Sequence, residues 1–264
     1  MCRVWFLAAF VILVGYADSG SVHEGPYYTS GSIVNAADNQ PGKLAPNTIA
    51  TMYGTGLAYT TKSVTGADIH GGVLPTVLPG TGVRVLIGGL PAVLYYVSPG
   101  QINFLVPSYL SPGAVSVQVI LDALAGPPVS MELASAAPAL FETSESNAVA
   151  TRPDGKLINP KSPAKPGDWV ILYATGLGQT IPPVIYGEVP TSAAEIEQMS
   201  EFELTLDGVA VDKSRVYYAG LAPYFAGLYQ INLKLPRSTG ANPEIRIAIG
   251  KQESVTGVRL PVQP

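Results

Sequence analysis

The chain has 264 residues, of which 47% are hydrophobic and 13% are charged, and its formal net charge at pH 7 is −4. This hydrophobic content excludes a disordered chain, and an acidic balance without a basic block argues against a nucleic-acid-binding surface. With 28 glycines and 24 prolines between short apolar runs, the composition is typical of an all-β protein of sandwich or barrel type.

The first 17 residues have the three-part pattern of a secretory signal peptide. Arg3 supplies the positive charge, Val4 to Val14 is an unbroken apolar run, and Ala17 is a small residue before a cleavage point at Asp18. A membrane span needs about 20 apolar residues, so this run is too short to be an anchor. We therefore expect an exported protein that is extracellular, periplasmic or associated with the cell surface, with no membrane span in the mature chain.

The only cysteine, Cys2, lies inside this signal segment, so the mature chain is expected to have no disulfide and no thiolate ligand or nucleophile. The two histidines, His23 and His70, are far apart in sequence and form no pair at the spacing of a helical metal site. We therefore expect neither a bound metal nor a cofactor.

Short apolar runs separated by turn residues predict two successive β-sandwiches, over residues 32–145 and 146–264, after a leader over residues 18–31. The strands expected in the first sandwich are 32–37, 48–53, 83–87, 92–97, 101–106, 115–121 and 129–133. Those expected in the second are 148–152, 156–158, 169–174, 202–206, 215–219, 229–235, 245–249 and 258–262. Residues 192–199 are the one candidate helix, about two turns long and marginal in isolation.

An internal repeat supports this division. The sequence Tyr53-Gly54-Thr55-Gly56-Leu57 returns as Tyr173-Ala174-Thr175-Gly176-Leu177, and Gln101-Ile102-Asn103 returns as Gln230-Ile231-Asn232. Two motifs that recur in the same order indicate one structural unit that has been duplicated. Shared features are best explained by the fold, so we expect a structural role for Tyr53, Gly56, Gln101, Asn103, Tyr173, Gly176, Gln230 and Asn232.

Each repeated motif suggests a physical role. The glycines are expected to supply positive φ where a strand turns away. The Gln and Asn side chains of each Gln-Ile-Asn motif point to one face of a strand, and we expect their amides to bond the backbone of a neighbouring loop.

The second copy differs from the first by an insert around Gly220 to Phe225. Tyr95 and Tyr96 match Tyr217 and Tyr218, which are therefore expected to belong to the core. Tyr224 and Phe225 lie in the insert and are a candidate contact surface, because aromatic rings suit sugar or protein binding. The alternative is that the insert packs against the first sandwich.

Several ordered motifs together resemble a known family. They are Leu74-Pro75-Thr76, the stretch from Val97 to Asn103, Pro163-Ala164-Lys165-Pro166-Gly167, the stretch from Tyr173 to Gly178, and the stretch from Tyr218 to Pro223. This combination resembles the Solibacter uncharacterised C-terminal domain family, whose halves are similar to IPT/TIG immunoglobulin-like domains. The resemblance implies two tandem immunoglobulin-like β-sandwiches in an exported bacterial protein. It implies no catalytic or ligand-binding residue.

Candidate catalytic residues are few. His70 has only Asp68 near it in sequence, and Ser98 lacks the Gly-x-Ser-x-Gly context of a nucleophile elbow. The one carboxylate cluster comprises Glu195, Glu197, Glu201 and Glu203. Paired carboxylates can divide acid and base roles in sugar hydrolysis, but alternating charge also keeps a sheet edge soluble, and we favour the second interpretation.

These observations favour a non-catalytic exported interaction or structural module whose partner is a protein or glycan at the cell surface. The alternative is a carbohydrate-binding module that uses Tyr224 and Phe225. A third possibility is a hydrolase that uses Ser98 or the carboxylate cluster. No nucleic-acid partner is expected.

Export gives a direct test of the first 17 residues. We expect N-terminal sequencing of the protein from the extracellular or periplasmic fraction to begin near Asp18, because the apolar run fits a cleaved signal. A full-length chain recovered from the cytoplasm would remove the basis for the predicted localisation.

Overall fold

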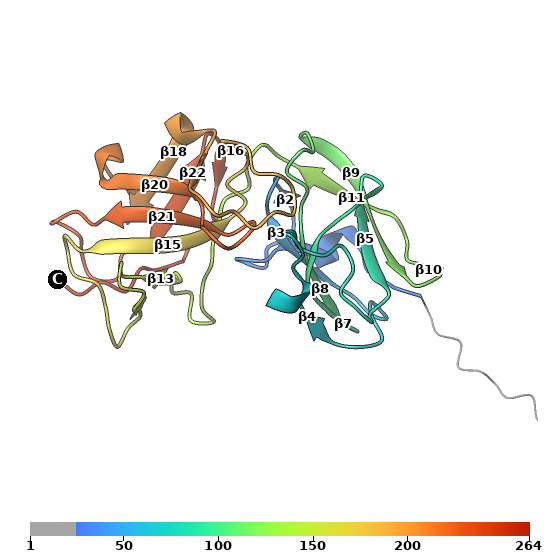
Figure 1. The fold of residues 1–264 in the computed structure, drawn as a ribbon. Coiled ribbons are helices and arrows are strands. Elements are labelled where there is room, and N and C mark those ends of the chain that lie inside the picture. Colours follow the sequence, from blue (N-terminus) through green and yellow to red (C-terminus); the bar gives the residue numbers. More distant parts are fainter. Residues whose placement is uncertain (1–24) are drawn as a thin grey trace, which may run out of the picture.

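The computed structural model describes residues 25–264, which form four β-sheets arranged as two packed pairs (Figure 1). The signal segment, Cys2, His23 and the first part of the leader lie outside the described residues. The expected all-β sandwich class is confirmed, because the described residues contain strands and short 3-10 turns and no α-helix. No helix in this part of the chain is long and apolar enough to cross a membrane.

The first unit pairs two sheets. One has the strand order β1-β3-β8-β7-β4, and the other has the order β2-β11-β9-β5-β6, with β10 paired to β9. The strands are β1 (Ile33–Asn35), β2 (Lys43–Leu44), β3 (Ile49–Tyr53), β4 (Lys62–Ser63), β5 (Val83–Ile87), β6 (Leu90–Pro91), β7 (Leu94–Ser98), β8 (Gln101–Leu105), β9 (Gly113–Leu121), β10 (Leu124–Ala125) and β11 (Val129–Leu133).

The second unit repeats this layout. Its larger sheet has the order β14-β13-β15-β21-β20-β17-β16, with β12 paired to β15, and its smaller sheet has the order β19-β18-β22-β23. The strands are β12 (Ala139–Leu140), β13 (Ala150–Thr151), β14 (Leu157–Ile158), β15 (Trp169–Thr175), β16 (Thr180–Ile181), β17 (Ala194–Ile196), β18 (Phe202–Leu206), β19 (Val209–Ala210), β20 (Val216–Leu221), β21 (Tyr229–Lys234), β22 (Ile245–Ile249) and β23 (Gln252–Glu253).

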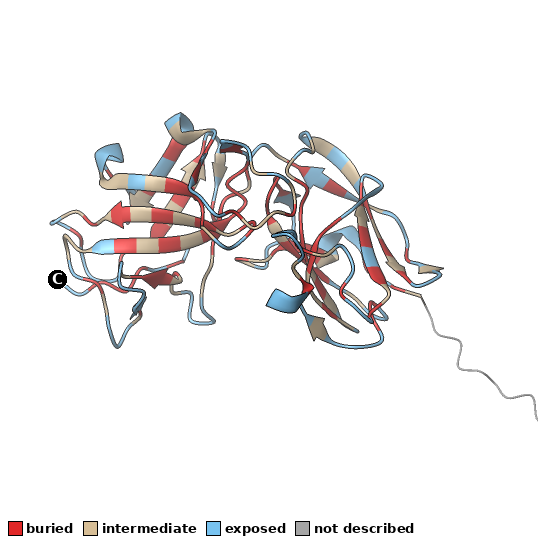
Figure 2. Cartoon of the chain, viewed as in Figure 1, coloured by how far each residue is buried: buried red, intermediate tan, exposed pale blue. Residues whose placement is uncertain are grey.

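Alternation along the strands places one face of each sheet in a core. Val83, Val85 and Ile87 of β5 are buried, and they belong to the same apolar cluster as Ile102 and Phe104 of the opposite sheet. The second unit has its own large cluster, which draws on β15, β21, β18 and β22. Figure 2 shows the same alternation of buried and less buried residues along β15 and β21.

Four short 3-10 turns connect strands within the described residues: η1 (Ser30–Ser32), η2 (Gly66–Asp68), η3 (Met199–Glu201) and η4 (Lys213–Arg215). The helix expected over residues 192–199 is wrong. Ala194 and Ile196 are buried while Glu195 is exposed, so the apolar period is two, and β17 pairs with β16 and β20. Two turns of helix could not compete with the backbone hydrogen bonds that β16 and β20 offer on the two sides of this segment.

The repeat occupies matching positions in the two units. Tyr53 lies opposite Gln101 across β3 and β8, as Tyr173 lies opposite Gln230 across β15 and β21. Gly56 has φ +62° and Gly176 has φ +77°, the left-handed conformation expected for the Thr-Gly-Leu turn. Both units also carry a β-bulge at the first tyrosine of the pair. The bulged residue is Tyr95, between Leu94 and Tyr96, in the first unit and Tyr217, between Val216 and Tyr218, in the second.

The Gln-Ile-Asn amides bond differently from the expectation, which is wrong in the first unit. The Gln101 amide donates to Asn103 Oδ1 at 2.8 Å, and the Thr51 hydroxyl donates to the same oxygen at 3.1 Å. In the second unit Ile171 takes the place of Thr51 opposite the Asn, and Asn232 Oδ1 has no hydrogen-bond partner among the described residues. In the first unit the two side chains of the motif therefore bond within their own sheet.

The chain passes from one unit to the other at residues 134–138. Leu133 ends the last strand of the first unit, whereas Ala139 and Leu140 already pair with Thr175 and Ala174 of the second. This passage lies before the division expected at residues 145 and 146, because the polar segment near 142–147 is a turn within the second unit.

The two units are joined by a hydrogen-bonded seam. The Tyr186 hydroxyl accepts from Val93 N at 2.8 Å and donates to Leu105 O at 3.0 Å. The Thr175 hydroxyl accepts from Ile49 N at 2.9 Å and donates to Gly227 O at 2.8 Å. A small apolar cluster that includes Leu74, Val93, Leu105 and Ala226 lies beside these bonds, so the insert of the second unit packs against the first.

The Tyr186 hydroxyl offers a test of this seam. We expect Tyr186→Phe to lower the free energy of unfolding by about 1–3 kcal/mol, because Val93 N and Leu105 O would both lose a partner at a buried position. Chemical denaturation measures the change. The matched control is Tyr217→Phe, which removes an exposed hydroxyl for which the structure shows no hydrogen bond, and equal losses in both variants would contradict the assigned role.

Candidate functional site: a cleft between the units

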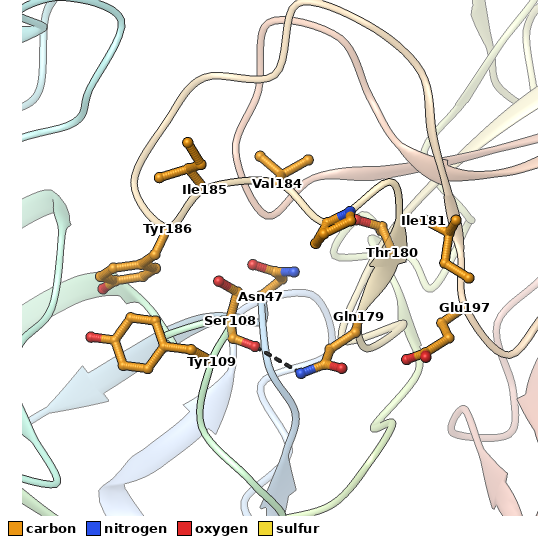
Figure 3. A pocket seen from close by; sticks show the side chains of 11 residues that line it. Asn47, Ser108, Tyr109, Gln179, Thr180, Ile181, Val184, Ile185, Tyr186 and Glu197 are labelled. Atoms are coloured by element: carbon orange, nitrogen blue, oxygen red, sulfur yellow. Dashed lines mark hydrogen bonds between the residues drawn. The ribbon is translucent and has the colours of Figure 1, made fainter.

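A cleft of about 540 Å³ opens where the two units meet (Figure 3). The first unit contributes Asn47, which precedes β3, and Ser108 and Tyr109, which follow β8. The second unit contributes the segment from Gln179 to Tyr186 and also Glu197, which follows β17. Cavities of this size commonly hold small ligands, particularly where two domains meet.

Two tyrosines form one side of the cleft. The ring of Tyr109 meets the ring of Tyr186 edge-on, with centroids 5.5 Å apart and planes at 87°. Tyr186 is fixed by its two hydrogen bonds across the seam, and burial raises the pKa of its phenol, so it remains a neutral donor. Tyr109 is 52% exposed, which leaves much of its ring free to contact a ligand. The cleft therefore presents an aromatic surface that the seam holds in position.

The rest of the cleft combines apolar side chains with a few polar groups. Ile181 is 61% exposed and Ile185 is 67% exposed, so two large apolar side chains at the rim of one cavity remain in contact with water. The Gln179 amide donates to Ser108 O at 3.0 Å, which ties the two walls together and leaves its carbonyl oxygen as an acceptor. Glu197 supplies a carboxylate on the side away from the tyrosines (Figure 3).

Among the described residues that line the cleft, Glu197 is the one carboxylate, so the carboxylate pair used in glycoside hydrolysis is not found there. Within residues 25–264 no group of three His, Cys, Asp or Glu residues is placed to hold a metal ion.

The structure separates the carboxylates of the predicted cluster. Glu195 and Glu197 lie on or beside β17 in the larger sheet, whereas Glu201 and Glu203 lie at the start of β18 in the smaller sheet. All four are exposed. Glu197 lines the seam cleft, whereas Glu203 lines a different cavity beside Arg246.

The other candidate catalytic residues are also apart. Asp68 accepts from the Thr65 backbone and hydroxyl and lies 3.4 Å from Lys62, and these contacts lower the pKa of its carboxyl, the Thr65 hydrogen bonds most. His70 is exposed in a turn that closes on Val73. The Ser98 hydroxyl donates to Gln101 O at 3.3 Å across the β7–β8 turn.

The insert divides between two roles. Tyr224 and Phe225 are 69% and 61% exposed at the tip of the β20–β21 hairpin, and Tyr224 has φ +70°. Their role as a contact surface stays a prediction. Ala226 and Gly227, which follow, pack against the first unit instead.

Tyr217 does not belong to the core. Its side chain is 57% exposed, whereas its counterpart Tyr95 is partly buried and donates to Ala226 O at 2.8 Å. Tyr218 fits the expectation better, because its hydroxyl donates to Leu221 O at 2.8 Å.

Sequence reasoning did not find Tyr109, Gln179, Ile181, Ile185 or Tyr186. They lie in two segments without a motif, of which the second includes β16, and the first precedes the second by about 70 residues. The only local signal is Tyr109 itself, a lone aromatic residue between the turn formers Pro107 and Pro112.

No family model matches this sequence. No curated protein matches it either. Solved structures with a similar fold include a surface glycan-binding protein of Bacteroides ovatus in complex with a mixed-linkage heptasaccharide, at 12% identity and a TM-score of 0.36, with 92% of this chain and 47% of that one covered. Another from Prevotella bryantii has 11% identity and a TM-score of 0.27, with 87% and 41% covered.

Domains 5–6 of the S-layer protein SbsC are a further example, at 9% identity and a TM-score of 0.27, with 90% of this chain and 98% of that chain covered. This chain spans less than half the length of the two glycan-binding proteins. Likenesses of this size concern the β fold alone and carry no function to this chain.

Proposed function

We propose that this chain is an exported, non-catalytic binding module and that the seam cleft holds a glycan. We also propose that it is a tandem immunoglobulin-like member of the Solibacter C-terminal domain family, on the strength of its ordered motifs. The glycan proposal rests on one observation, the exposed Tyr109 ring fixed edge-on by Tyr186 beside amide and carboxylate groups. The fold neighbours include glycan-binding proteins, but the proposal does not depend on them.

A sugar ring matches this chemistry. A pyranose has an apolar face of C–H groups and a rim of hydroxyls, so it can stack on an aromatic ring while its edges bond polar side chains. In the cleft the Tyr109 ring supplies the flat surface, and Gln179 and Glu197 supply acceptors. Tyr186 and Gln179 already hold the two walls together by hydrogen bonds. The side chains of the cleft therefore lose little conformational entropy when a ligand binds.

The absence of catalysis is part of the proposal. Glu197 has no second carboxylate in the cleft to share acid and base roles, and the other glutamates of the predicted cluster lie elsewhere. A glycan that enters the cleft is therefore expected to leave unchanged. Product analysis of each bound glycan by mass spectrometry checks this, and turnover that Glu197→Gln abolishes would overturn the non-catalytic assignment.

The cleft can be tested against the insert as the binding surface. We expect a glycan array to identify a neutral ligand, and Tyr109→Ala to weaken its binding about tenfold or more, because a central aromatic contact is worth more than about 1.4 kcal/mol. Isothermal titration calorimetry measures the affinity, and thermal unfolding verifies that the variant is folded.

The matched control is the double variant Tyr224→Ala/Phe225→Ala, which removes two exposed rings outside the cleft. Binding lost only in the double variant would transfer the site to the insert. Absence of any glycan ligand for the unmodified chain would leave the structural role and refute the binding proposal.

A further inference from the structure

A second surface of different chemistry lies at the end of the second unit that faces away from the first (Figure 1). Trp169 begins β15 and lies opposite Lys234, which ends β21. The rings of Trp169 and Tyr217 pack together with centroids 4.4 Å apart and planes at 54°, and Lys234 Nζ lies 5.6 Å from the Trp169 ring. We call Trp169, Tyr217, Lys234, Arg215 and Arg237 the end surface.

The end surface combines exposed rings with concentrated positive charge. Trp169 is 38% exposed and Tyr217 is 57% exposed. A cavity of about 560 Å³ beside them is lined by Arg215, Lys234 and Arg237 and by one carboxylate, Asp168. The chain as a whole has a formal net charge of −4, so this gathering of cations runs against the average charge of the molecule.

The cations of the end surface are largely available to a ligand. Asp168 Oδ2 already accepts from Lys165 N at 2.9 Å, as a turn cap. Arg215 has one long bond of 3.5 Å to Leu235 O, and it attracts Asp212, whose pKa is lowered mainly by its bonds to Ser214. None of the ion pairs found within residues 25–264 involves Arg215, Lys234 or Arg237.

In the first unit the matching position is covered by the second unit. By register, Ile49, Leu105 and the bulged Tyr95 are the counterparts of Trp169, Lys234 and Tyr217. There the second unit packs directly on them. Tyr95 donates to Ala226 O at 2.8 Å, and a Cβ added to Gly227 would lie 2.9 Å from Ile49 and closer still to Leu105.

A second copy of the chain cannot cover the end surface in the same way. The covering contacts come from the insert between β20 and β21, which brings Ala226 and Gly227 to the seam. The corresponding β7–β8 connection of the first unit is the tight turn Pro99–Gly100 and lacks this insert. At the first unit the covering segment meets apolar side chains. A unit that covered the end surface in the same way would bury three cations, at a large cost in desolvation free energy.

We propose that the end surface binds an acidic saccharide that carries uronate groups. The Trp169–Tyr217 pair offers a surface for the apolar face of a pyranose. The guanidinium groups of Arg215 and Arg237 match a carboxylate, which arginine can bind through two parallel hydrogen bonds. An anion without a sugar ring would contact only the cations, and the exposed Trp169 and Tyr217 rings would have no role in binding it. This site is separate from the seam cleft and does not depend on it.

Trp169 makes the site directly observable. The sequence has two tryptophans, Trp5 and Trp169. A shortened chain that begins at Asp18 lacks Trp5 and keeps every described residue, so its tryptophan emission comes from Trp169 alone. We expect oligogalacturonate to change the Trp169 emission on binding, and the same oligosaccharide as its methyl ester to produce little change. Affinity is also expected to fall as salt is raised from 50 to 200 mM, because the pairing is exposed to solvent.

Substitutions then assign the contacts by calorimetry. Trp169→Ala and Arg237→Gln are each expected to weaken oligogalacturonate binding tenfold or more, and Trp169→Phe to retain part of it. Lys251→Gln removes the same charge from the exposed β22–β23 turn and is expected to have no effect. Thermal unfolding confirms that each variant is folded, and Tyr109→Ala in the seam cleft is expected to leave this affinity unchanged.

The proposal is overturned if acid and ester bind equally, if no binding is detected, or if both Trp169→Ala and Arg237→Gln bind as the unmodified chain does. Equal binding of a DNA oligonucleotide or inorganic phosphate that is insensitive to Trp169→Ala would also overturn it, since charge alone would then suffice. Failure of the neutral-glycan experiment at the seam cleft leaves each of these outcomes intact.

Discussion

The contact between the insert of the second unit and the end of the first is the constraint on which the rest of this molecule depends. Gly227 lies so close to Leu105 and Ile49 that no side chain would fit, and its φ of +68° suits glycine. Tyr186 and Thr175 add hydrogen bonds on either side of this contact. Together they fix one unit against the other, and the cleft lined by Tyr109 and Gln179 exists only because of that fixed arrangement.

Much of the fold follows from local sequence. Gly88-Gly89 and Asp207-Gly208 turn tightly with positive φ at both residues, and they join the antiparallel pairs β5–β6 and β18–β19. The Thr-Gly-Leu turns and the paired strands around Gln-Ile-Asn also occupy the expected places. The turns and the individual strands are set by residues close together in sequence, so they can be judged without the tertiary structure.

The errors arise where partners distant in sequence decide the outcome. The segment from Ser192 to Met199 has two glutamates and was expected to be helical, but pairing with β20 on one side and β16 on the other makes Ala194–Ile196 a strand. The Asn103 amide was expected to reach a loop, but its Oδ1 accepts from the Thr51 hydroxyl on the neighbouring strand, distant in sequence, and from the Gln101 amide. The cleft residues Tyr109 and Tyr186 come from loops without a motif, and only the packing of the two units brings their rings together.

Duplication explains why the two ends of this molecule differ. Both copies place a bulged tyrosine beside the end of the same strand pair, and in the first copy the insert of the second covers it. The second copy has no such cover among the described residues, so its side chains at this position face solvent. An apolar patch exposed at this position would promote aggregation. Here the exposed ring of Trp169 lies beside Lys234 and Arg237, so the surface carries charge. The copies differ at one more matched position, where Ile171 stands opposite Asn232 and offers no hydroxyl, whereas Thr51 stands opposite Asn103 and donates to its Oδ1.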